Sequence, residues 1–350
     1  MIGHLTKPPA KALRCPFVAG NFPVSRPRRL RTSNALRHLV AETRLDVGNL
    51  VAPLFVREGI DEPQPIASLP GVVQHTRESL RAEVTELADL GIGAVILFGV
   101  PSTKDSIGSK AFDPEGIVQL CLADLVEKVG DRMVLMADLC VDEYTDHGHC
   151  GILDGPADDP NTSVDNDATL EIYGRIAVAQ ATAGAHVVAP SGMMDGQVGA
   201  IRTALDSAGF PSTSILAYSA KYASGLYGPF RDAVDVQIAS GGNRKGYQQD
   251  FRNAREALVE IDEDLAQGAD MVMVKPALSY LDVIAAVRAH TNVPVAAYHV
   301  SGEYAMIKAA AANGWIDHDT VAVEHLTAIK RAGADVILTY LARWFAETQR

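Results

Sequence analysis

Residues 268–276 read GADMVMVKP, an apolar run that ends on a lysine followed by a proline. A glycine before such a run supplies the left-handed residue that ends a helix, and Met271–Val274 is typical of a strand buried on both faces. Lys275 ends this strand, where its amine can attack a carbonyl group. A second lysine, Lys221, ends another apolar run over 214–220. The chain therefore offers two amines in equivalent positions.

The joint between a helical stretch, a glycine and an apolar run recurs along the chain. It occurs at Leu90–Ala94, Ala183–His186, Gln267–Asp270 and Ala332–Asp335. Eight apolar runs are candidate strands: Leu50–Val56, Ala94–Val100, Met133–Cys140, His186–Pro190, Ile215–Lys221, Met271–Lys275, Val293–Val300 and Val336–Tyr340. Stretches with helical periodicity lie between them, for example Glu78–Leu90, Leu170–Ala183, Ala254–Ala266 and Leu281–His290. This alternation predicts a parallel α/β sheet.

Eight such units favour a closed (β/α)8 TIM barrel over an open doubly wound sheet. The dinucleotide-binding form of the open sheet also loses support, because no Gly-x-Gly-x-x-Gly follows an early strand. Residues 1–45 lie outside the alternation and contain the basic run Arg26–Arg31. We expect an extended N-terminal arm over 1–45, solvated or in contact with another subunit, and a catalytic barrel over 46–350.

Composition narrows the class of protein. The 350 residues include 43 acidic and 31 basic side chains, a formal charge of -12, which disfavours nucleic-acid binding. There is no apolar segment that could span a bilayer and no secretory signal, so we expect a cytoplasmic enzyme. Four cysteines are too few for a disulfide framework in a chain of this length: Cys15, Cys121, Cys140 and Cys150.

The catalytic groups of such a barrel lie at the C-terminal ends of its strands. The expected strand ends carry Asp138, Cys140, Ser191, Lys221, Lys275, Ser301 and Tyr340. Two lysines at one barrel mouth repel one another and lose hydration, and both effects favour the neutral amine that forms a Schiff base. A carbonyl substrate is implied. The alternative is that each lysine extends out of the barrel to pair with loop carboxylates.

The loop after the third expected strand concentrates metal-binding side chains. Residues 138–151 contain two thiols, two histidines and four carboxylates. This set suits Zn²⁺ with Cys140, Asp142 and Cys150 as ligands, which leaves one position open for substrate or water. The alternative is a polar loop with incidental cysteines.

Two later glycine-rich segments, 222–232 and 241–248, carry Arg231 and Arg244. They predict a mobile lid that closes over an anionic substrate, because guanidinium binds carboxylate in a bidentate fork. For each arginine the alternative is a surface salt bridge.

Several motifs in order resemble the porphobilinogen synthase family, also called 5-aminolevulinate dehydratase, over nearly the whole chain. They are the basic run Arg26–Arg31, APSGMMDG at 189–196, MVKP at 273–276 and YHVSGEY at 298–304. The resemblance implies a lyase, more closely a hydro-lyase. Such an enzyme condenses two molecules of 5-aminolevulinate into porphobilinogen with loss of water, an early step towards haem and other tetrapyrroles.

The resemblance also implies a role for each site residue. Lys275 would form a Schiff base with the substrate that becomes the propionate side, and Lys221 would engage the keto group of the second substrate. Asp138 would lie near the reacting amine as a proton-transfer group. The two substrate carboxylates are expected at Ser301 and Tyr340 for the first molecule, and at Arg231, Arg244 and Gln248 for the second.

The metal loop is a hybrid of the family's usual forms. Zinc-dependent members carry three cysteines there, and members without this zinc carry Ala, Asp and Asp. With Cys140, Asp142 and Cys150, we expect Zn²⁺ to bind more weakly and with more pH dependence than to three thiolates. Gly246 stands where some members place a further cysteine, which puts a second zinc site shared with His149 in doubt.

Glu256 matches a position that some members use for an allosteric Mg²⁺ at a subunit boundary. One carboxylate can suffice, because Mg²⁺ usually keeps several waters. The alternative is an exposed helix glutamate paired with Arg252 or Arg255. The family forms octamers whose N-terminal arms wrap a neighbour, so the resemblance implies a homo-octamer.

Two other functions stay open on the sequence alone. Another Schiff-base barrel aldolase shares a lysine on the sixth strand, but it does not require Lys221, and its sugar-phosphate substrates call for a phosphate-binding loop. A catalytically inactive assembly or regulatory protein is the other. Lys221, Lys275, Ser301 and Tyr340 argue against it.

Overall fold

The structure is a computed structural model, and it describes residues 22–159, 161–239 and 242–350. Cys15, much of the expected arm and Gly241 of the expected lid lie outside the described residues. The chain forms two compact units, Met1–Arg44 and Leu45–Arg350. The boundary between the two units lies between Arg44 and Leu45.

The described part of the first unit contains two short helical turns. A 3-10 helix covers Pro27–Arg31, and helix α1 covers Asn34–Leu39. Ser33 begins α1, because its Oγ accepts a hydrogen bond from the backbone N–H of Leu36 at 3.2 Å. Neither turn buries a side chain. Within the unit itself, packing therefore adds little to the stability of these turns.

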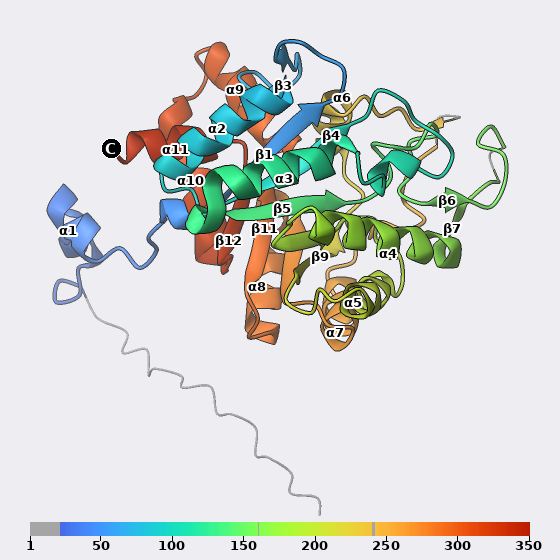
Figure 1. Cartoon of the computed structure of the whole chain (residues 1–350). Helices are drawn as coiled ribbons and strands as arrows, with labels where there is room; N and C mark the ends of the chain where they lie inside the picture. The colour runs from blue at the N-terminus through green and yellow to red at the C-terminus, as the bar shows by residue number, and fades with distance from the viewer. Residues whose placement is uncertain (1–21, 160, 240–241) are drawn as a thin grey trace, which may run out of the picture. The chain divides into compact units, whose positions relative to one another are not determined.

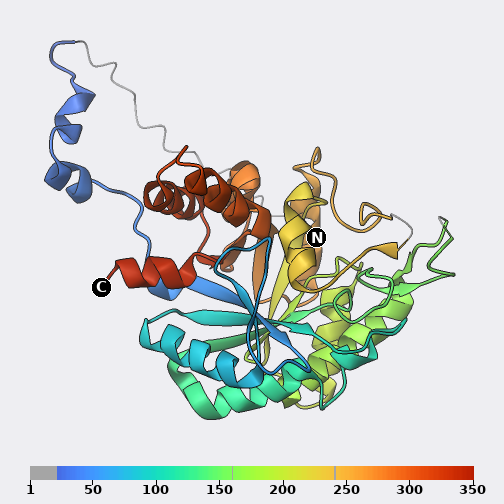
Figure 2. The same cartoon turned by 90° about the horizontal axis from the view of Figure 1, so that it is seen from above.

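The second unit is a closed barrel of parallel strands, which confirms the predicted fold. Each expected apolar run forms one strand, and the last strand pairs with the first through Leu50↔Ile337 and Val51↔Leu338. Figures 1 and 2 show the strands at the centre with helices around them. In barrel order the strands are β1 (Leu50–Arg57), β4 (Ala94–Val100), β5 (Val134–Leu139), β8 (Val187–Pro190), β9 (Ser214–Lys221), β10 (Met271–Lys275), β11 (Val295–His299) and β12 (Val336–Thr339).

The strands are apolar on both faces because one face fills the barrel and the other packs on the helices. All seven residues of β4, AVILFGV, are buried. Such continuous runs are typical of parallel sheets covered on both sides. The alternative of an open sheet is wrong, because β12 closes onto β1.

The helices that surround the barrel end as the glycine joints predict. Gly91, Gly184, Gly268 and Gly333 have φ angles of 82°, 100°, 105° and 123°, the left-handed backbone that glycine adopts without strain. The helices of this unit are α2 (Arg77–Asp89), α3 (Ile117–Val129), α4 (Asn166–Thr182), α5 (Gln197–Ser207), α6 (Gly228–Ala233), α7 (Glu256–Ala266), α8 (Leu281–His290), α9 (Ser301–Ala312), α10 (His318–Ala332) and α11 (Ala342–Thr348).

Helix starts are where the sequence predictions are less exact. Helix α4 begins four residues before the expected Leu170, because Asp165 Oδ1 accepts a hydrogen bond from the backbone N–H of Ala168 at 3.0 Å. This cap satisfies a free donor of the first turn and lets the polar start of the helix form.

The loops that follow β1 and β5 contain short additional strands. β2 (Gln64–Pro65) and β3 (Val73–His75) pair with each other, and β3 extends the sheet beside β1. β6 (Ile152–Leu153) and β7 (Val164–Asp165) form a separate hairpin after β5. In the described part of the chain, no helix is both long and apolar enough to cross a membrane.

Candidate active site

Lys275 and Lys221 are direct neighbours at the mouth of the barrel. Lys275 ends β10 and Lys221 ends β9, and the two residues are paired in the register of these adjacent strands. Both side chains are buried, with 6% of Lys275 and 4% of Lys221 exposed. The alternative in which the lysines extend outward to loop carboxylates is therefore wrong.

The amine of Lys275 lies in a cage of aromatic rings. Its Nζ is 4.5 Å from the ring centre of Tyr298, 5.0 Å from Tyr218, and 5.3 Å from both Tyr227 and Phe230. Aromatic faces attract a cation but hydrate it poorly. The cage also restricts how a substrate can approach the amine.

A β-bulge brings Tyr218 and Lys221 to the same side of β9. The register changes from Val272↔Ala217 to Val274↔Ala220, so β9 contains one extra residue at this point. Strict alternation would place residues three apart on opposite faces. Because of the bulge, the Lys221 amine lies 5.6 Å from the ring centre of Tyr218.

Ser191, which follows β8, connects the second lysine to Asp138. Lys221 donates a hydrogen bond to the Ser191 carbonyl, while Ser191 Oγ donates to Asp138 Oδ2 at 3.0 Å. Asp138 Oδ1 is buried and has no hydrogen-bond partner among the described residues. A buried carboxylate oxygen of this kind can accept a proton from a bound molecule.

Burial shifts the protonation of both Lys275 and Asp138. It lowers the pKa of Lys275 to about 7, helped by the charge of Lys221 and opposed by Asp138. Burial also raises the pKa of Asp138 to about 6, although Lys275 and Lys221 pull that pKa down. A lysine with a pKa near 7 has a substantial neutral fraction at neutral pH, as a nucleophile requires.

Six of the predicted site residues line one narrow cavity at the mouth. They are Asp138, Asp142, Lys221, Arg231, Arg244 and Lys275. Arg231 is half-buried and Arg244 is buried. The Nε atoms of both arginines are buried without a hydrogen-bond partner among the described residues. Unsatisfied guanidinium donors next to two amines make the cavity complementary to a carboxylate.

Arg244 also has a protein partner that the sequence did not predict. Its Nη2 forms a salt bridge of 2.7 Å with Asp142 Oδ2 and a hydrogen bond of 2.8 Å with the carbonyl of Gly148. Burial raises the pKa of Asp142, but Arg244 and Lys221 outweigh it and hold that pKa well below its usual range. Asp142 is therefore ionised and shared between Arg244 and the metal loop.

Cys140, Asp142 and Cys150 come together as the sequence predicts. All three are buried, and one ligand atom from each lies within 4.8 Å of the others. A tetrahedral zinc ion holds two thiolates about 3.8 Å apart, so this spacing fits the ion. Tyr173 lies beside the cluster, with its hydroxyl 3.7 Å from Cys140 Sγ and donating to the Cys150 carbonyl at 2.5 Å.

Ser301 and Tyr340 lie beside the aromatic cage around Lys275. Ser301 Oγ accepts from the backbone N–H of Phe230 at 3.0 Å and donates to the Leu226 carbonyl at 3.3 Å. The Tyr340 hydroxyl lies 3.3 Å from that of Tyr298. Ser301 thus holds the segment after β9, and Tyr340 contacts a ring of the cage.

Gln248 and Glu256 are not in the narrow cavity. They line a neighbouring polar cavity of 570 Å³, together with His149 and Gly246. Gln248 Nε2 is buried without a partner among the described residues. Glu256 is the first residue of α7, and its carboxylate accepts from Asn253 Nδ2 at 3.2 Å. The nearby Arg252 pairs with Asp250 instead.

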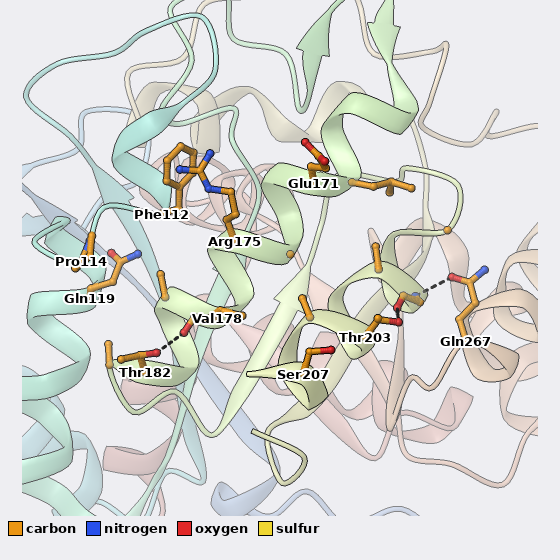
Figure 3. Close-up of a pocket in the computed structure, with 18 of the residues that line it drawn as sticks. Phe112, Pro114, Gln119, Glu171, Arg175, Val178, Thr182, Thr203, Ser207 and Gln267 are labelled. Carbon is orange, nitrogen blue, oxygen red and sulfur yellow. Dashed lines mark hydrogen bonds between the residues drawn. The ribbon is translucent and has the colours of Figure 1, made fainter. Parts of the chain in front are cut away.

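A further cavity lies outside the barrel, between helices α3, α4 and α5. It measures 1170 Å³ and contains none of the predicted site residues. Figure 3 shows mostly short side chains along it, with Arg175 stacked on Phe112 at one edge, its guanidinium 3.7 Å from the ring centre. The chemical groups are therefore at the barrel mouth and not in this groove.

Two groups of residues at the site could not be predicted from the motifs in the sequence. The aromatic cage comes from β9, the segment 222–232 and β11, and only Tyr298 stands within a motif of the family resemblance. Glu303 is the second: it is buried and accepts from the backbone N–H groups of Leu278 at 2.6 Å and Val300 at 2.7 Å. The signal for Glu303 was its position three residues after Val300 at the start of a helix.

A closed (β/α)8 barrel with two buried lysines side by side at its mouth is typical of enzymes that capture carbonyl compounds as Schiff bases. Comparison with known proteins narrows this class. The family described as Delta-aminolevulinic acid dehydratase matches residues 24–348. This chain belongs to that family.

The similarity to named relatives extends over nearly the whole chain. Delta-aminolevulinic acid dehydratase of Streptomyces coelicolor is 57% identical over 95% of this chain and 99% of its own length. That of Mycobacterium leprae is 58% identical over 92% and 96%. A solved structure from Toxoplasma gondii, delta-aminolevulinic acid dehydratase (porphobilinogen synthase) with the reaction product porphobilinogen, has a TM-score of 0.89 at 43% identity, covering 93% of this chain and 91% of that one.

Proposed function

We propose that this chain is a porphobilinogen synthase, a hydro-lyase that condenses two molecules of 5-aminolevulinate into porphobilinogen with loss of water. The family to which the chain belongs and the names of its relatives support this activity. The observation that carries the proposal is the pair of buried lysines, Lys275 and Lys221, in register at one mouth. Each substrate molecule has one ketone, and each of the two lysines supplies one amine that can react with a ketone.

Lys275 captures the first substrate. Its neutral Nζ adds to the ketone carbon, the nitrogen loses its protons, and the ketone oxygen leaves as water to give the Schiff base. The lowered pKa of Lys275, about 7, keeps enough of the amine neutral for this step. Covalent capture also fixes which of two identical molecules occupies the first position.

Lys221 engages the ketone of the second substrate. The Ser191 carbonyl accepts a hydrogen bond from Lys221 and so orients its amine. Asp138, which accepts from Ser191 Oγ on one oxygen, has its other oxygen free to take a proton from the reacting amine. One residue, Ser191, therefore aligns the second amine with the base.

The substrate carboxylates are bound by donors on two sides of the lysine pair. Ser301 and Tyr340 serve the first substrate, beside the cage around Lys275. Arg231, Arg244 and Gln248 serve the second, and each has a buried N–H group without a protein partner among the described residues. Unmatched buried donors are costly, so an anionic ligand that accepts from them binds favourably.

Cys140, Asp142 and Cys150 would hold a zinc ion beside the second substrate. When bound there, zinc supplies a Lewis acid that polarises a substrate oxygen. Asp142 must serve both the ion and Arg244, so metal binding and substrate binding are linked through one carboxylate. Glu256 is proposed as a magnesium ligand with the remaining positions filled by water.

Assembly into a homo-octamer is part of the proposal. The basic run Arg26–Arg31 lies in the compact unit Met1–Arg44, and none of its side chains is buried in the described part of that unit. Contact with a neighbouring subunit would give this segment a partner. Light scattering of the purified protein tests this part independently of activity.

The activity has a direct test. Pure protein given 5-aminolevulinate should form porphobilinogen, measured as the colour of its pyrrole with an aldehyde reagent. Addition of borohydride should trap one substrate on Lys275, located by peptide mapping. Pyrrole formation without an adduct at Lys275 would contradict the assignment of the nucleophile. Activity with sugar phosphates alone would select the aldolase alternative, and no activity with either would favour an assembly protein.

The pH dependence of catalysis follows from two ionisations. The value of kcat/KM should fall as the pH drops through about 7 and then about 6, because Lys275 gains a proton and Asp138 loses its basic form. Below both values the fall approaches about 100-fold per pH unit. A profile that stays flat down to pH about 5 would contradict this prediction.

The variant Asp138→Asn separates the two ionisations. The carboxylate of Asp138 raises the pKa of Lys275, so its removal should move the pKa of Lys275 lower. The rate of borohydride trapping in this variant should then follow a single ionisation, at lower pH than in the native protein. An unchanged midpoint would mean that Asp138 does not act on Lys275.

A further inference from the structure

Helix α6 (Gly228–Ala233), which follows β9, carries two side chains to the active site. The ring of Phe230 lies 5.3 Å from the Lys275 amine and packs on Phe55 and Phe98, with ring centres 5.9 and 5.2 Å away. Arg231 lines the narrow cavity. The position of α6 therefore decides where the guanidinium of Arg231 lies.

The C-terminal end of α6 is held by side chains from the opposite part of the barrel. Gln74 of β3 donates from Nε2 to the carbonyl of Ala233 at 2.7 Å. Lys104, in the loop after β4, donates from Nζ to the carbonyls of Val234 at 3.2 Å and Asp235 at 2.8 Å. The last carbonyls of a helix have no partner within it. Gln74 satisfies the carbonyl of Ala233, the last residue of α6, and Lys104 satisfies those of the two residues that follow.

Further contacts fix the same segment. Arg57, the last residue of β1, pairs with Asp235 and donates to Gln74 Oε1 at 3.0 Å. Ser68 Oγ donates to Asp232 Oδ2 at 2.6 Å. Asp235 itself has a φ of 51°, a left-handed backbone that few residues other than glycine adopt. The contacts that hold this conformation must stabilise it by more than its free-energy cost.

These contacts cross the barrel mouth. Helix α6 follows β9, the fifth barrel strand, in the chain, but the segment at its end is bonded to side chains of β1, β3 and the loop after β4. Phe230 is held separately, at the middle of the helix, by Ser301 Oγ. The bonds from Lys104 and Gln74 therefore act on the end of α6 that is next to Arg231.

Lys104 does not line the cavity and so acts from behind the helix. Its amine is half-buried, and the charges that face it are Glu143, Asp235, Asp142 and Arg57. Burial lowers the pKa of Lys104, and the three carboxylates oppose that shift. The side chain thus serves as a donor to backbone carbonyls.

We propose that Lys104 and Gln74 are positioning residues that hold α6 across the barrel mouth, so that Arg231 is fixed for the carboxylate of the second substrate. The inference rests on the proposed function and adds to it. The inference assigns these bonds to one of the two substrates. Capture of the first molecule at Lys275 does not need the bonds from Lys104 and Gln74, whereas binding of the second molecule does. The two residues thereby set the concentration of 5-aminolevulinate at which the enzyme works.

The test compares Lys104→Met with Lys104→Arg and with Lys110→Met. Lys104→Met keeps a side chain of similar length but loses the amine that donates hydrogen bonds. The arginine of Lys104→Arg can still donate to the two carbonyls. Lys110 is a matched control, because it is in the same loop and pairs with Asp113 at 2.9 Å. Steady-state kcat and KM and the amount of borohydride adduct at Lys275 are measured for each variant.

Lys104→Met should raise KM by about tenfold and leave the borohydride adduct at Lys275 unchanged. Lys104→Arg should recover most of the native KM, and Lys110→Met should keep it. Gln74→Leu should raise KM in the same direction. An unchanged KM in Lys104→Met, or an equal loss of the adduct, would overturn the proposal. Absence of adduct and pyrrole in the native protein would instead refute the proposed function.

Discussion

Replacing Lys275 with methionine should lower the rate of porphobilinogen formation by about 1000-fold or more, because the proposed first Schiff base forms on this amine. Methionine has a similar length and is apolar, so it suits the cage of Tyr298, Tyr218, Tyr227 and Phe230. The thermal unfolding midpoint should therefore stay near that of the native protein. Turnover is measured by the pyrrole assay, and the adduct by mass analysis after borohydride. Thermal denaturation gives the unfolding midpoint.

Two matched variants make this result specific. Lys128→Met removes an exposed lysine in the last turn of α3 and should keep native turnover. Lys221→Met should also lose turnover but still give the borohydride adduct on Lys275, because the first substrate is captured there. Substantial turnover by Lys275→Met would refute its assignment as the nucleophile. Loss of the Lys275 adduct in Lys221→Met would mean that the second lysine is required for the first capture.

The barrel and the pair of lysines could be predicted from the sequence because both follow local rules. A glycine after each helix and an apolar run after each glycine locate the strands, and the end of a parallel strand locates the catalytic groups. Lys221 and Lys275 each satisfy that rule, and adjacent strands then bring them together. No information about distant contacts is needed for this step.

The surroundings of the lysines depend on contacts that no local rule contains. The bulge in β9 turns Tyr218 to the same side as Lys221, against the alternation that the sequence implies. The salt bridge between Arg244 and Asp142 joins residues 102 apart in the chain. Lys104 and Gln74 meet the end of α6 only because the helix crosses the mouth. Such pairings are set by tertiary packing.

Removing metal from the proposed site at Cys140, Asp142 and Cys150 should lower turnover by at least about 100-fold. Cys140→Ser should have the same effect, because a neutral hydroxyl is a poor zinc ligand compared with a thiolate. The borohydride adduct at Lys275 should persist in both cases, since the cluster is proposed to act on the second substrate. Elemental analysis, turnover and adduct yield are measured before chelation, after it and after zinc is restored.

Cys121→Ala is the matched control for this experiment. Cys121 is also buried, but it lies on α3 outside the cluster, and burial raises its pKa to about 12, so it does not supply a thiolate. Its loss should leave metal content and turnover unchanged and reduce the free energy of unfolding by about 1 kcal/mol. Full turnover in a zinc-free preparation would contradict the role of the cluster.

The mixed ligand set leads to a further expectation for the same measurement. Zinc at the proposed site would displace the protons of two thiols and compete with Arg244 for the carboxylate of Asp142. Zinc content at equilibrium should therefore fall steeply as the pH drops. Asp142→Cys should retain zinc at lower free metal concentrations than the native protein does, because it adds a third thiolate. In this variant Arg244 loses the buried carboxylate with which it forms a salt bridge. If that variant binds zinc more tightly yet raises KM, the carboxylate of Asp142 serves substrate binding through Arg244 as well as the metal.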